Sequence, residues 1–328
     1  MKKVFVIIVF LLSSFAASAQ LINKIDLFLS NRYYRGNYDT TYIARPAIGK
    51  WTLAVRTSLN WTNNTITFQE DEDTYKFKMR SELNPKFSIY ASYLGLGASF
   101  SRSYKRLSGQ DEPDWSFKFN NYGNHFGLEF SLSEVNSMKG TLKWVDKGLT
   151  VHLPENLVNQ ISFYLHCYFA VNSKKFSYPA AFTYSFTQKR SAGSLLIGGV
   201  LNVNLTDISI SDSTETYNIV NITNFTTGVG VGYGYNFVLP QNWLLHVSAL
   251  PYLVINGGTR YTIDDKDEES SEAEFPESYI VGRTAVIHAM GRWFVGVTGQ
   301  VNYYNIRCEH VKTGNTQWEF IGFVGVRL

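Results

Sequence analysis

A two-residue alternation of apolar with polar or small side chains runs through most of the chain. In the stretch 228–237, one face carries Val, Val, Tyr, Tyr and Phe, and the other carries four glycines and an Asn. Successive side chains of a strand point to opposite faces, so this stretch predicts a strand with one aromatic face and one bare face. That combination is typical of a transmembrane β-barrel strand, whose outer face meets lipid. The bare face predicts lumen positions at Gly228, Gly230, Gly232 and Gly234.

The same alternation recurs in thirteen segments that are separated by turns or polar loops. The segments are 51–59, 74–84, 87–104, 122–133, 138–146, 159–172, 177–188, 191–206, 225–238, 243–256, 279–290, 293–306 and 317–328. Bacterial single-chain barrels have an even number of strands, so either two segments form one strand or one lies outside the barrel. We predict an all-β fold, a transmembrane antiparallel β-barrel of about 12 strands, with 10 and 14 as the limits.

The segment 293–306 separates its two faces clearly. Its apolar face alternates with Thr298, Gln300 and Asn302, which we predict to face the lumen. Polar groups in a water-filled lumen carry no desolvation penalty.

The final segment, 317–328, places Glu319 and Arg327 on its inner face. A barrel strand at the end of the chain resembles the outer-membrane sorting signal, although Leu328 stands where an aromatic residue is usual. The segment therefore predicts the barrel-assembly machinery as a partner.

Loop lengths predict which end of the barrel faces outward. With the C-terminus in the periplasm, long connections fall outside the cell and short turns fall inside, which is the usual asymmetry. The long connections are 206–224, 260–278 and 306–317, and the short turns are 188–190, 239–242 and 290–292. The acidic run 264–274 lacks the spaced ligands of a calcium loop, and we interpret it as a solvated loop.

The N-terminus predicts export. Lys2 and Lys3 precede a short apolar run and the small residues Ala17-Ser18-Ala19, which is the pattern of a secretory signal peptide over residues 1–19. The apolar run is shorter than the roughly 20 residues that span a bilayer. We predict a periplasmic lead-in over 20–49, with a plug that enters the lumen as the alternative, and the barrel over 50–328.

Composition supports a barrel in the outer membrane. Aromatic residues are 16% of the chain and charged residues only 17%, below the usual quarter or so. The net charge of +3 predicts no nucleic-acid partner, so membrane lipids are the expected surroundings. Cys167 and Cys308 leave open both a disulfide and two isolated residues.

One pair of residues is a candidate for catalysis. His246 and Ser248 are two apart on a strand, so the imidazole and the hydroxyl point the same way, as some outer-membrane lipid hydrolases require. The neighbouring apolar residues predict that both face the lumen, and the alternative is an ordinary polar lumen pair. The other histidines lack metal-ligand spacing, and the glycine alternation lies inside a strand. We predict no metal site and no cofactor.

Three stretches carry a family resemblance: 37–46, 175–182 and 188–194. The chain resembles a family of exported Gram-negative proteins classed as domain of unknown function 4421, over roughly 30–328. The resemblance implies an outer-membrane barrel without an assigned activity and without catalytic residues.

Two features lie in the second and third of these stretches. Within a strand, proline is expected only at the start or at a bulge, and the position of Pro179 just after Lys174-Lys175 fits the start of the predicted strand 177–188. The basic turn 188–191 is either a tight turn or a periplasmic contact site for an acidic partner or lipid phosphate.

The main functional hypothesis is a structural or transport component without catalysis. Small barrels pack their interiors with side chains, so we expect a filled lumen; a small-molecule solute would be a partner of an open one. The alternatives are a hydrolase of lipid or envelope polymer that uses His246 and Ser248, and a soluble periplasmic β-sandwich that binds a ligand.

Overall fold

The computed structural model describes residues 24, 26, 27, 30, 37–45, 50–70, 73–104, 113–211, 216–263, 269–274, 277–309 and 311–328. The chain divides into two compact units, 1–37 and 38–328. In the first unit, the described residues of 24–30 are helical, and the Ser30 hydroxyl lies 3.4 Å from an Asp26 oxygen. The predicted signal peptide, 1–19, lies outside the described residues.

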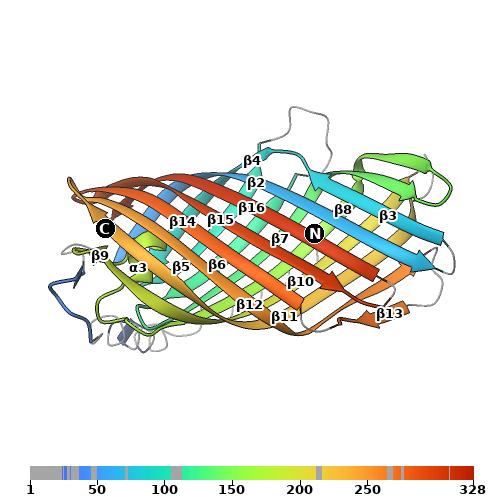
Figure 1. Ribbon diagram of the computed structural model, residues 1–328. Coiled ribbons are helices and arrows are strands. Elements are labelled where there is room, and N and C mark those ends of the chain that lie inside the picture. The colour runs from blue at the N-terminus through green and yellow to red at the C-terminus, as the bar shows by residue number, and fades with distance from the viewer. Residues whose placement is uncertain are drawn as a thin grey trace. The chain divides into compact units, whose positions relative to one another are not determined.

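The second unit is a barrel (Figure 1). Among the described residues, twelve antiparallel strands follow one another around a closed ring. In ring order they are β2 Trp51–Glu70, β4 Asn84–Tyr93, β5 Leu96–Ser103, β6 Trp115–Tyr122, β7 Phe126–Trp144, β8 Leu149–Ala170, β10 Ala192–Ser211, β11 Thr216–Leu239, β12 Trp243–Ile263, β14 Glu277–Met290, β15 Trp293–Arg307 and β16 Val311–Arg327. The last strand pairs with the first along its whole length, which closes the ring. The predicted antiparallel barrel of twelve strands is confirmed.

Five short elements, four strands and a helix, complete the described part of the unit. The strand β3, Asp73–Ser81, pairs with both β2 and β7, and β13, Glu269–Glu272, pairs with β12. The strands β1, Ile43–Ala44, and β9, Thr187–Gln188, form a separate two-stranded sheet. The helix α3 has five residues, Tyr178–Phe182. In the described part of the chain, no helix is long and apolar enough to cross a membrane.

The count of twelve is right, although several predicted segments divide differently. The predicted segments 122–133 and 138–146 fall mainly in one strand, β7. The predicted segment 87–104 is mostly two strands, β4 and β5, joined at Leu94 and Gly95. Both turn residues have positive φ, at 50° and 91°, as a tight hairpin turn requires.

The prediction of a strand over 177–188 is wrong. After β8 the chain leaves the wall, forms α3 and β9, and rejoins the wall as β10; we term residues 171–191 the plug segment. Pro179 lies in the first turn of α3, where a missing N–H removes no helical hydrogen bond. The turn 188–190 is likewise not a turn between wall strands, because Gln188 belongs to β9.

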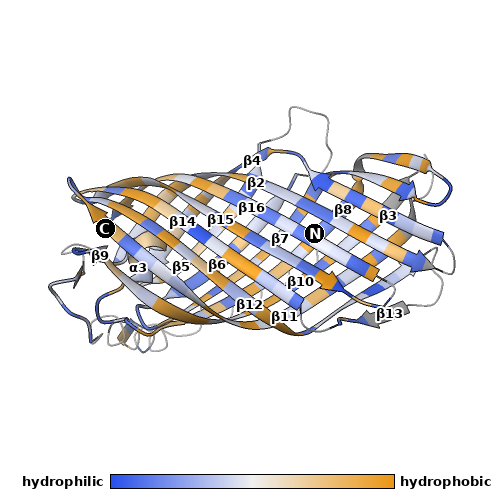
Figure 2. Ribbon diagram, viewed as in Figure 1, coloured by the Kyte–Doolittle hydropathy of each residue, from blue (hydrophilic) through white to orange (hydrophobic). Residues whose placement is uncertain are grey.

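The outer face of the ring is apolar. Along β11, the outward residues Val229, Val231 and Tyr233 are each more than half exposed. Figure 2 shows that hydrophobic positions predominate toward the end that carries α3 and β9, and that polar positions become frequent toward β3. A continuous apolar surface of this extent is suited to lipid. The closed ring with this outer face is therefore a transmembrane barrel and not the alternative soluble sandwich.

The strands are much longer than a membrane requires. The strands β8, β10, β11 and β12 have 22, 20, 24 and 21 residues, whereas about 9–11 residues suffice to span a bilayer. The barrel therefore continues beyond its apolar band at the end opposite the plug segment, and we term this continuation the outer lobe. Its interior is an apolar cluster that includes Ile66, Phe68, Phe77, Met79, Met138, Leu153, Val158, Ile208, Val220, Ile222, Ile306, Cys308 and Val311.

Candidate functional site: the closed interior of the barrel

The Gln188 side chain holds the plug segment together from a buried position. Its amide oxygen accepts hydrogen bonds from the Ser177 backbone N–H at 2.9 Å and from Asn236 Nδ2 at 3.0 Å. Its Nε2 donates to the carbonyl oxygens of Lys175 at 2.6 Å and Arg190 at 2.9 Å. Since Asn236 belongs to β11, this amide fastens the plug segment to the barrel wall.

A second contact fastens the plug segment to the N-terminal strand β1. Ile43 pairs with Gln188, and the Lys189 ammonium group donates to the Thr40 carbonyl at 3.0 Å. Nearby, the side-chain and backbone hydrogen bonds from Thr41 lower the pKa of Asp39. Residues 40–44 are therefore in direct contact with the plug segment.

Asn236 continues the chain of hydrogen bonds to His246 and Ser248 on β12. Its amide oxygen lies 2.7 Å from His246 Nδ1, and His246 Nε2 lies 3.0 Å from the Ser248 hydroxyl. An amide oxygen can only accept, so Nδ1 carries the proton and Nε2 accepts from the hydroxyl. The order of orienting group, imidazole and hydroxyl is the order of a nucleophilic triad.

The plug segment covers this array completely. Phe176, Tyr178 and Phe182 pack against the His246 ring with centroid distances of 6.0, 5.2 and 5.0 Å. His246 is 0% and Ser248 3% exposed. The structure therefore places both candidate residues in the interior, beneath the plug segment and away from the lipid face.

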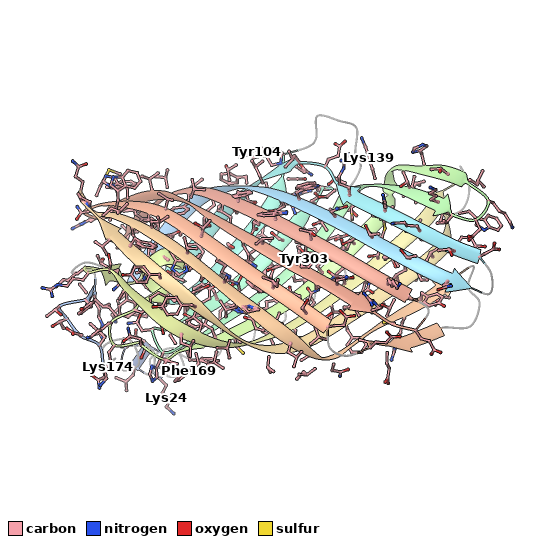
Figure 3. The ribbon with its side chains drawn as sticks, in the orientation of Figure 1. Lys24, Tyr104, Lys139, Phe169, Lys174 and Tyr303 are labelled. Atoms are coloured by element: carbon pink, nitrogen blue, oxygen red, sulfur yellow. The ribbon has the colours of Figure 1, made fainter. Side chains whose placement is uncertain are left out.

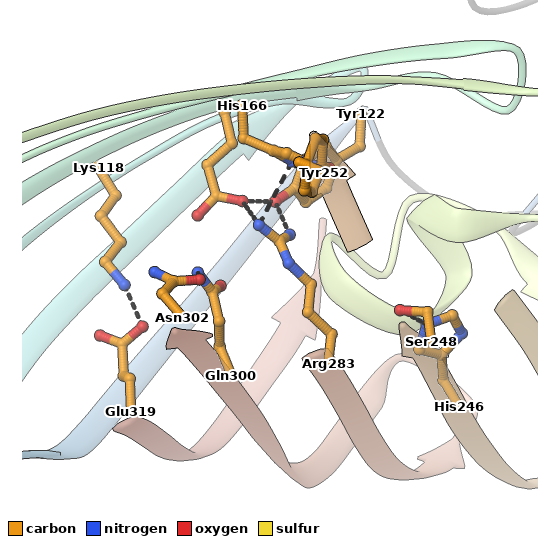
Figure 4. Close-up of polar contacts among 11 residues, drawn as sticks. Lys118, Tyr122, His166, His246, Ser248, Tyr252, Arg283, Gln300, Asn302 and Glu319 are labelled. Carbon is orange, nitrogen blue, oxygen red and sulfur yellow. Dashed lines mark hydrogen bonds and ion pairs between the residues drawn. The ribbon is translucent and has the colours of Figure 1, made fainter. Parts of the chain in front are cut away.

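A charged centre lies beside the plug segment (Figure 4). Arg283 Nη2 on β14 is 2.6 Å from a Glu129 carboxylate oxygen on β7, and Nη1 donates to the Tyr122 hydroxyl at 2.8 Å. The Tyr122 hydroxyl also donates to Glu129. Both charged side chains are almost fully buried. The group joins strands on opposite sides of the ring.

Further contacts cross the interior between strands that are not neighbours. His166 on β8 bonds the Tyr252 hydroxyl on β12 at 2.6 Å, and Lys118 on β6 pairs with Glu319 on β16. Closer to the outer lobe, the Asn204 amide on β10 donates to the Tyr304 hydroxyl on β15 at 2.7 Å. Such direct contacts between distant wall strands leave little room for a passage.

Two small cavities remain around the charged centre, with volumes of about 90 and 60 Å³. Gln300 lines both, Asn302 lines the larger, and Thr298 lines the smaller. A water needs on the order of 10–15 Å³ of such volume, so the larger cavity has room for about six to nine waters and the smaller for about four to six.

The predicted glycine stripe is packed against its neighbours. A Cβ at Gly230 would lie 2.8 Å from the Tyr252 ring, and a Cβ at Gly234 would lie 3.2 Å from the Phe176 ring. At Gly232 it would lie 2.1 Å from the Ala249 carbonyl oxygen, and at Gly228 3.1 Å from that of Leu253. The bare face lets the backbone and side chains of β12 and the plug segment approach closely.

Sequence reasoning missed the residues that bind the interior together. Arg283 and Glu129 are single charges inside otherwise apolar or small stretches, Val281 to Ile287 and Phe126 to Leu132. A lone charge in the middle of a predicted wall strand is the signal that could have found them. Gln188 and Asn236 carried no comparable signal, because amides are common on a lumen face.

Two open predictions concern cysteines and metals. Cys167 and Cys308 are free, so the two isolated residues are the correct alternative. Within the described ranges, no group of three or more His, Cys, Asp or Glu side chains is placed to hold a metal ion.

Comparison with known proteins gives a family and several distant folds. Residues 37–327 match the family described as Domain of unknown function (DUF4421). No curated protein matches the chain. Among solved structures, the outer membrane protease OmpT from Escherichia coli is 6% identical, with a TM-score of 0.46, covering 88% of this chain and 100% of its own.

Two further structures are more distant. The translocator domain of the autotransporter NalP from Neisseria meningitidis is 13% identical, with a TM-score of 0.32, covering 96% and 98%. The outer membrane protein OprG from Pseudomonas aeruginosa is 8% identical, with a TM-score of 0.28, covering 86% and 98%. The description of the fold therefore rests on the strand pairing itself.

Proposed function

Because the chain belongs to the family described as Domain of unknown function (DUF4421), which carries no activity to transfer, we propose a function from the interior of the barrel. The protein is a structural component of the outer membrane, closed to solutes at rest and without catalysis. It anchors the outer lobe in the bilayer.

The observation that carries this proposal is that the interior is blocked at three successive levels. The plug segment fills the end with the short turns, and the Arg283 to Glu129 pair crosses the middle. The apolar cluster of the outer lobe fills the other end. Water and ions cross a barrel only through a continuous polar channel, and each of these levels interrupts one.

Planar-bilayer recording tests the proposal. Purified full-length protein should insert without producing ion-conducting steps, while a known porin under the same conditions conducts. Steady single-channel steps from the unmodified protein would contradict a closed barrel. The proposal would then give way to a passive pore for a small-molecule solute.

Location and orientation are parts of the same proposal. The signal peptide is removed before Gln20, residues 20–49 stay in the periplasm, and 50–328 span the outer membrane with the outer lobe outside. The short turns support this orientation, since periplasmic turns are usually the short ones. Thiol labelling of intact cells should modify Lys147→Cys in the 145–148 turn and spare Gln241→Cys in the opposite turn; the reverse pattern would invert the orientation.

The barrel-assembly machinery is the proposed partner of β16. This strand ends at Arg327 and closes the ring against β2, so insertion depends on its delivery to the first strand. A chain that ends at residue 310 should accumulate in the periplasm and be degraded. Normal insertion of that truncated chain would argue against recognition through the last strand.

A second candidate function, lipid hydrolysis, rests on the Asn236, His246 and Ser248 distances of 2.7 and 3.0 Å. The Ser248 oxygen would attack an ester carbonyl as its proton passes to His246 Nε2, and the imidazolium would give that proton to the departing alcohol. Water, deprotonated by the same nitrogen, would then cleave the acyl-serine, release the fatty acid and restore the hydroxyl. This chemistry requires the plug segment to leave first. Phospholipid turnover by a Gln188→Ala variant that disappears in Gln188→Ala/Ser248→Ala would support it, and equal turnover by the two would remove it.

A further inference from the structure

The outer lobe carries a group of cations on its outward surface. They lie on the sheet formed by β2, β3, β7 and β8, at alternate positions that point away from the apolar cluster. We term this group the basic face. Its cations are Lys76, Lys78, Arg80, Lys139 and Lys143, and the imidazole of His152 lies on the same face.

The strand register places like charges directly opposite one another. Lys76 pairs with Lys143, and Arg80 pairs with Lys139, across the β3 and β7 ladder. Like charges in opposed positions destabilise a sheet. These opposed charges do not stabilise the outer lobe. We therefore look for a negatively charged partner outside the chain that would neutralise them.

Carboxylates of the chain itself neutralise little of this charge. Glu82 pairs with Lys139 at 2.5 Å. Among the residues that the structure describes, Lys76, Lys78, Arg80 and Lys143 form no ion pair. Four cations on one surface therefore have no counter-charge among the described side chains.

A groove lies within the basic face. It has a volume of about 470 Å³, and Lys78, Arg80, Lys139 and His152 are among the residues that line it. Asn63 and Thr141 add neutral polar groups to the lining. Cationic and hydrogen-bonding groups around a depression suit phosphate oxygens, which accept several such bonds at once.

The basic face begins where the lipid-facing band ends. On β2, Trp61 is the last large apolar residue on the outward side, and the next outward residue, Asn63, pairs directly with Arg80. Two residues of a strand tilted by about 45° rise about 5 Å along the membrane normal. Figure 3 places Lys139 toward the end that carries β3, opposite the end that carries Lys174. Arg80 therefore lies at the level of lipid headgroups.

We propose that the basic face binds the phosphate groups of a phosphorylated glycolipid in the outer leaflet. The inference rests on the proposed orientation, in which the outer lobe is outside the cell. The face points away from the barrel wall, beginning at the level of the headgroups, so its partner is a molecule anchored in the membrane beside the barrel. Basic residues near a membrane surface attract anionic lipids in this way.

The test measures binding of purified full-length protein in detergent to lipid A with and without its phosphates. The unmodified protein should bind the phosphorylated form at least about tenfold more tightly, and added salt should weaken that binding. The variant Lys76→Gln/Lys78→Gln/Arg80→Gln/Lys143→Gln should lose the preference. A matched control, Lys147→Gln/Arg260→Gln/Arg307→Gln/Lys312→Gln, removes four cations elsewhere and should keep it.

Equal binding of the two lipid forms by the unmodified protein, or equal loss in the control variant, would overturn the proposal. Binding of phosphatidylglycerol vesicles as tight as that of lipid A would overturn the assignment to a glycolipid. Heat-dependent mobility on gels verifies that both fourfold variants remain folded. Labelling of Lys147→Cys from the periplasmic side alone would indicate instead that the proposed orientation has failed.

Discussion

The two ends of the barrel are closed by different means. At one end, a connection between two wall strands folds inward and is fastened through a few buried amides, chiefly Gln188 and Asn236. At the other end, inward side chains of the wall strands, such as Ile66, Met138 and Ile222, belong to one apolar cluster in the interior. One end is closed by an inserted segment, and the other end is closed by the packed side chains of the wall strands.

The plug segment can move independently of the wall, whereas the apolar cluster of the outer lobe cannot. The plug segment contributes no strand to the ring, so it can leave without breaking any ladder of the wall. The apolar cluster of the outer lobe has no such freedom, because its side chains belong to the strands that form the wall. Opening the plug end is therefore a local event, whereas opening the outer lobe requires loss of packing throughout it.

The largest expected effect concerns the wall beside the plug segment. Gly232→Leu should prevent barrel folding, since even its Cβ would lie 2.1 Å from the Ala249 carbonyl oxygen. Loss of the heat-sensitive compact band on gels would report the failure. Gly322→Leu is the matched control, because a Cβ there meets nothing within 4 Å. A compact band from Gly232→Leu would show that the wall at this point can yield.

Breaking the charged centre should give the next largest effect, a large decrease in the free energy of unfolding. Glu129→Ala leaves the Arg283 guanidinium buried without its carboxylate, which typically costs about 3–5 kcal/mol. Urea unfolding in detergent micelles measures the change. A double variant, Glu129→Gln/Arg283→Met, removes both charges and should recover part of the loss; if it is less stable than the single variant, the pair itself is the main stabilising contact.

Packing in the outer lobe gives the next effect. Met79→Ala removes a fully buried side chain and should lower stability by about 2–5 kcal/mol without exposing residues under the plug segment. Val231→Ala, on the lipid-facing side of β11, is the control and should change stability much less. Equal losses in the two variants would mean that the cluster is not a packed core.

The smallest change in stability should come from unfastening the plug segment. Gln188→Ala removes several buried hydrogen bonds, and leaving one such group unpaired costs about 1–3 kcal/mol. In a Ser248→Cys background, Gln188→Ala should speed reaction with a thiol reagent, while conductance stays low because the outer lobe is still closed. The exposed change Lys174→Ala, in the same segment, should leave the labelling slow. Ion conduction after Gln188→Ala alone would show that the outer lobe does not close its end of the barrel.

Much of the wall could be predicted from the sequence because contact with lipid gives each strand its own alternation of apolar residues. Positions such as Val229, Val231 and Tyr233 alternate with small residues whatever their neighbours do, and that pattern was sufficient for the class of fold. The count of twelve required in addition the rule that bacterial barrels have an even number of strands. The plug segment escaped prediction because its residues are as apolar as those of a strand. Only the position of Pro179 hinted otherwise, and it fits a helix start as well as a strand start.

The interior contacts could not be predicted for a different reason. Arg283 and Glu129 lie far apart in the sequence. Their contact depends on the strand register and on the distance across the ring. No local pattern encodes either property. The sequence indicated that His246 and Ser248 share a face of one strand, but the Asn236 amide that orients the imidazole comes from the neighbouring strand.

The pairing of β16 with β2 has a consequence for how the molecule is made. The first wall strand and the last wall strand are hydrogen-bonded from Val311 and Phe68 to Arg327 and Thr52, so the ring cannot close before the whole chain has been synthesised. Contacts between the ends of a chain slow folding, and unpaired strand edges invite aggregation. Closure of the ring therefore follows synthesis of β16, and a chain that lacks this strand keeps an unpaired edge on β2.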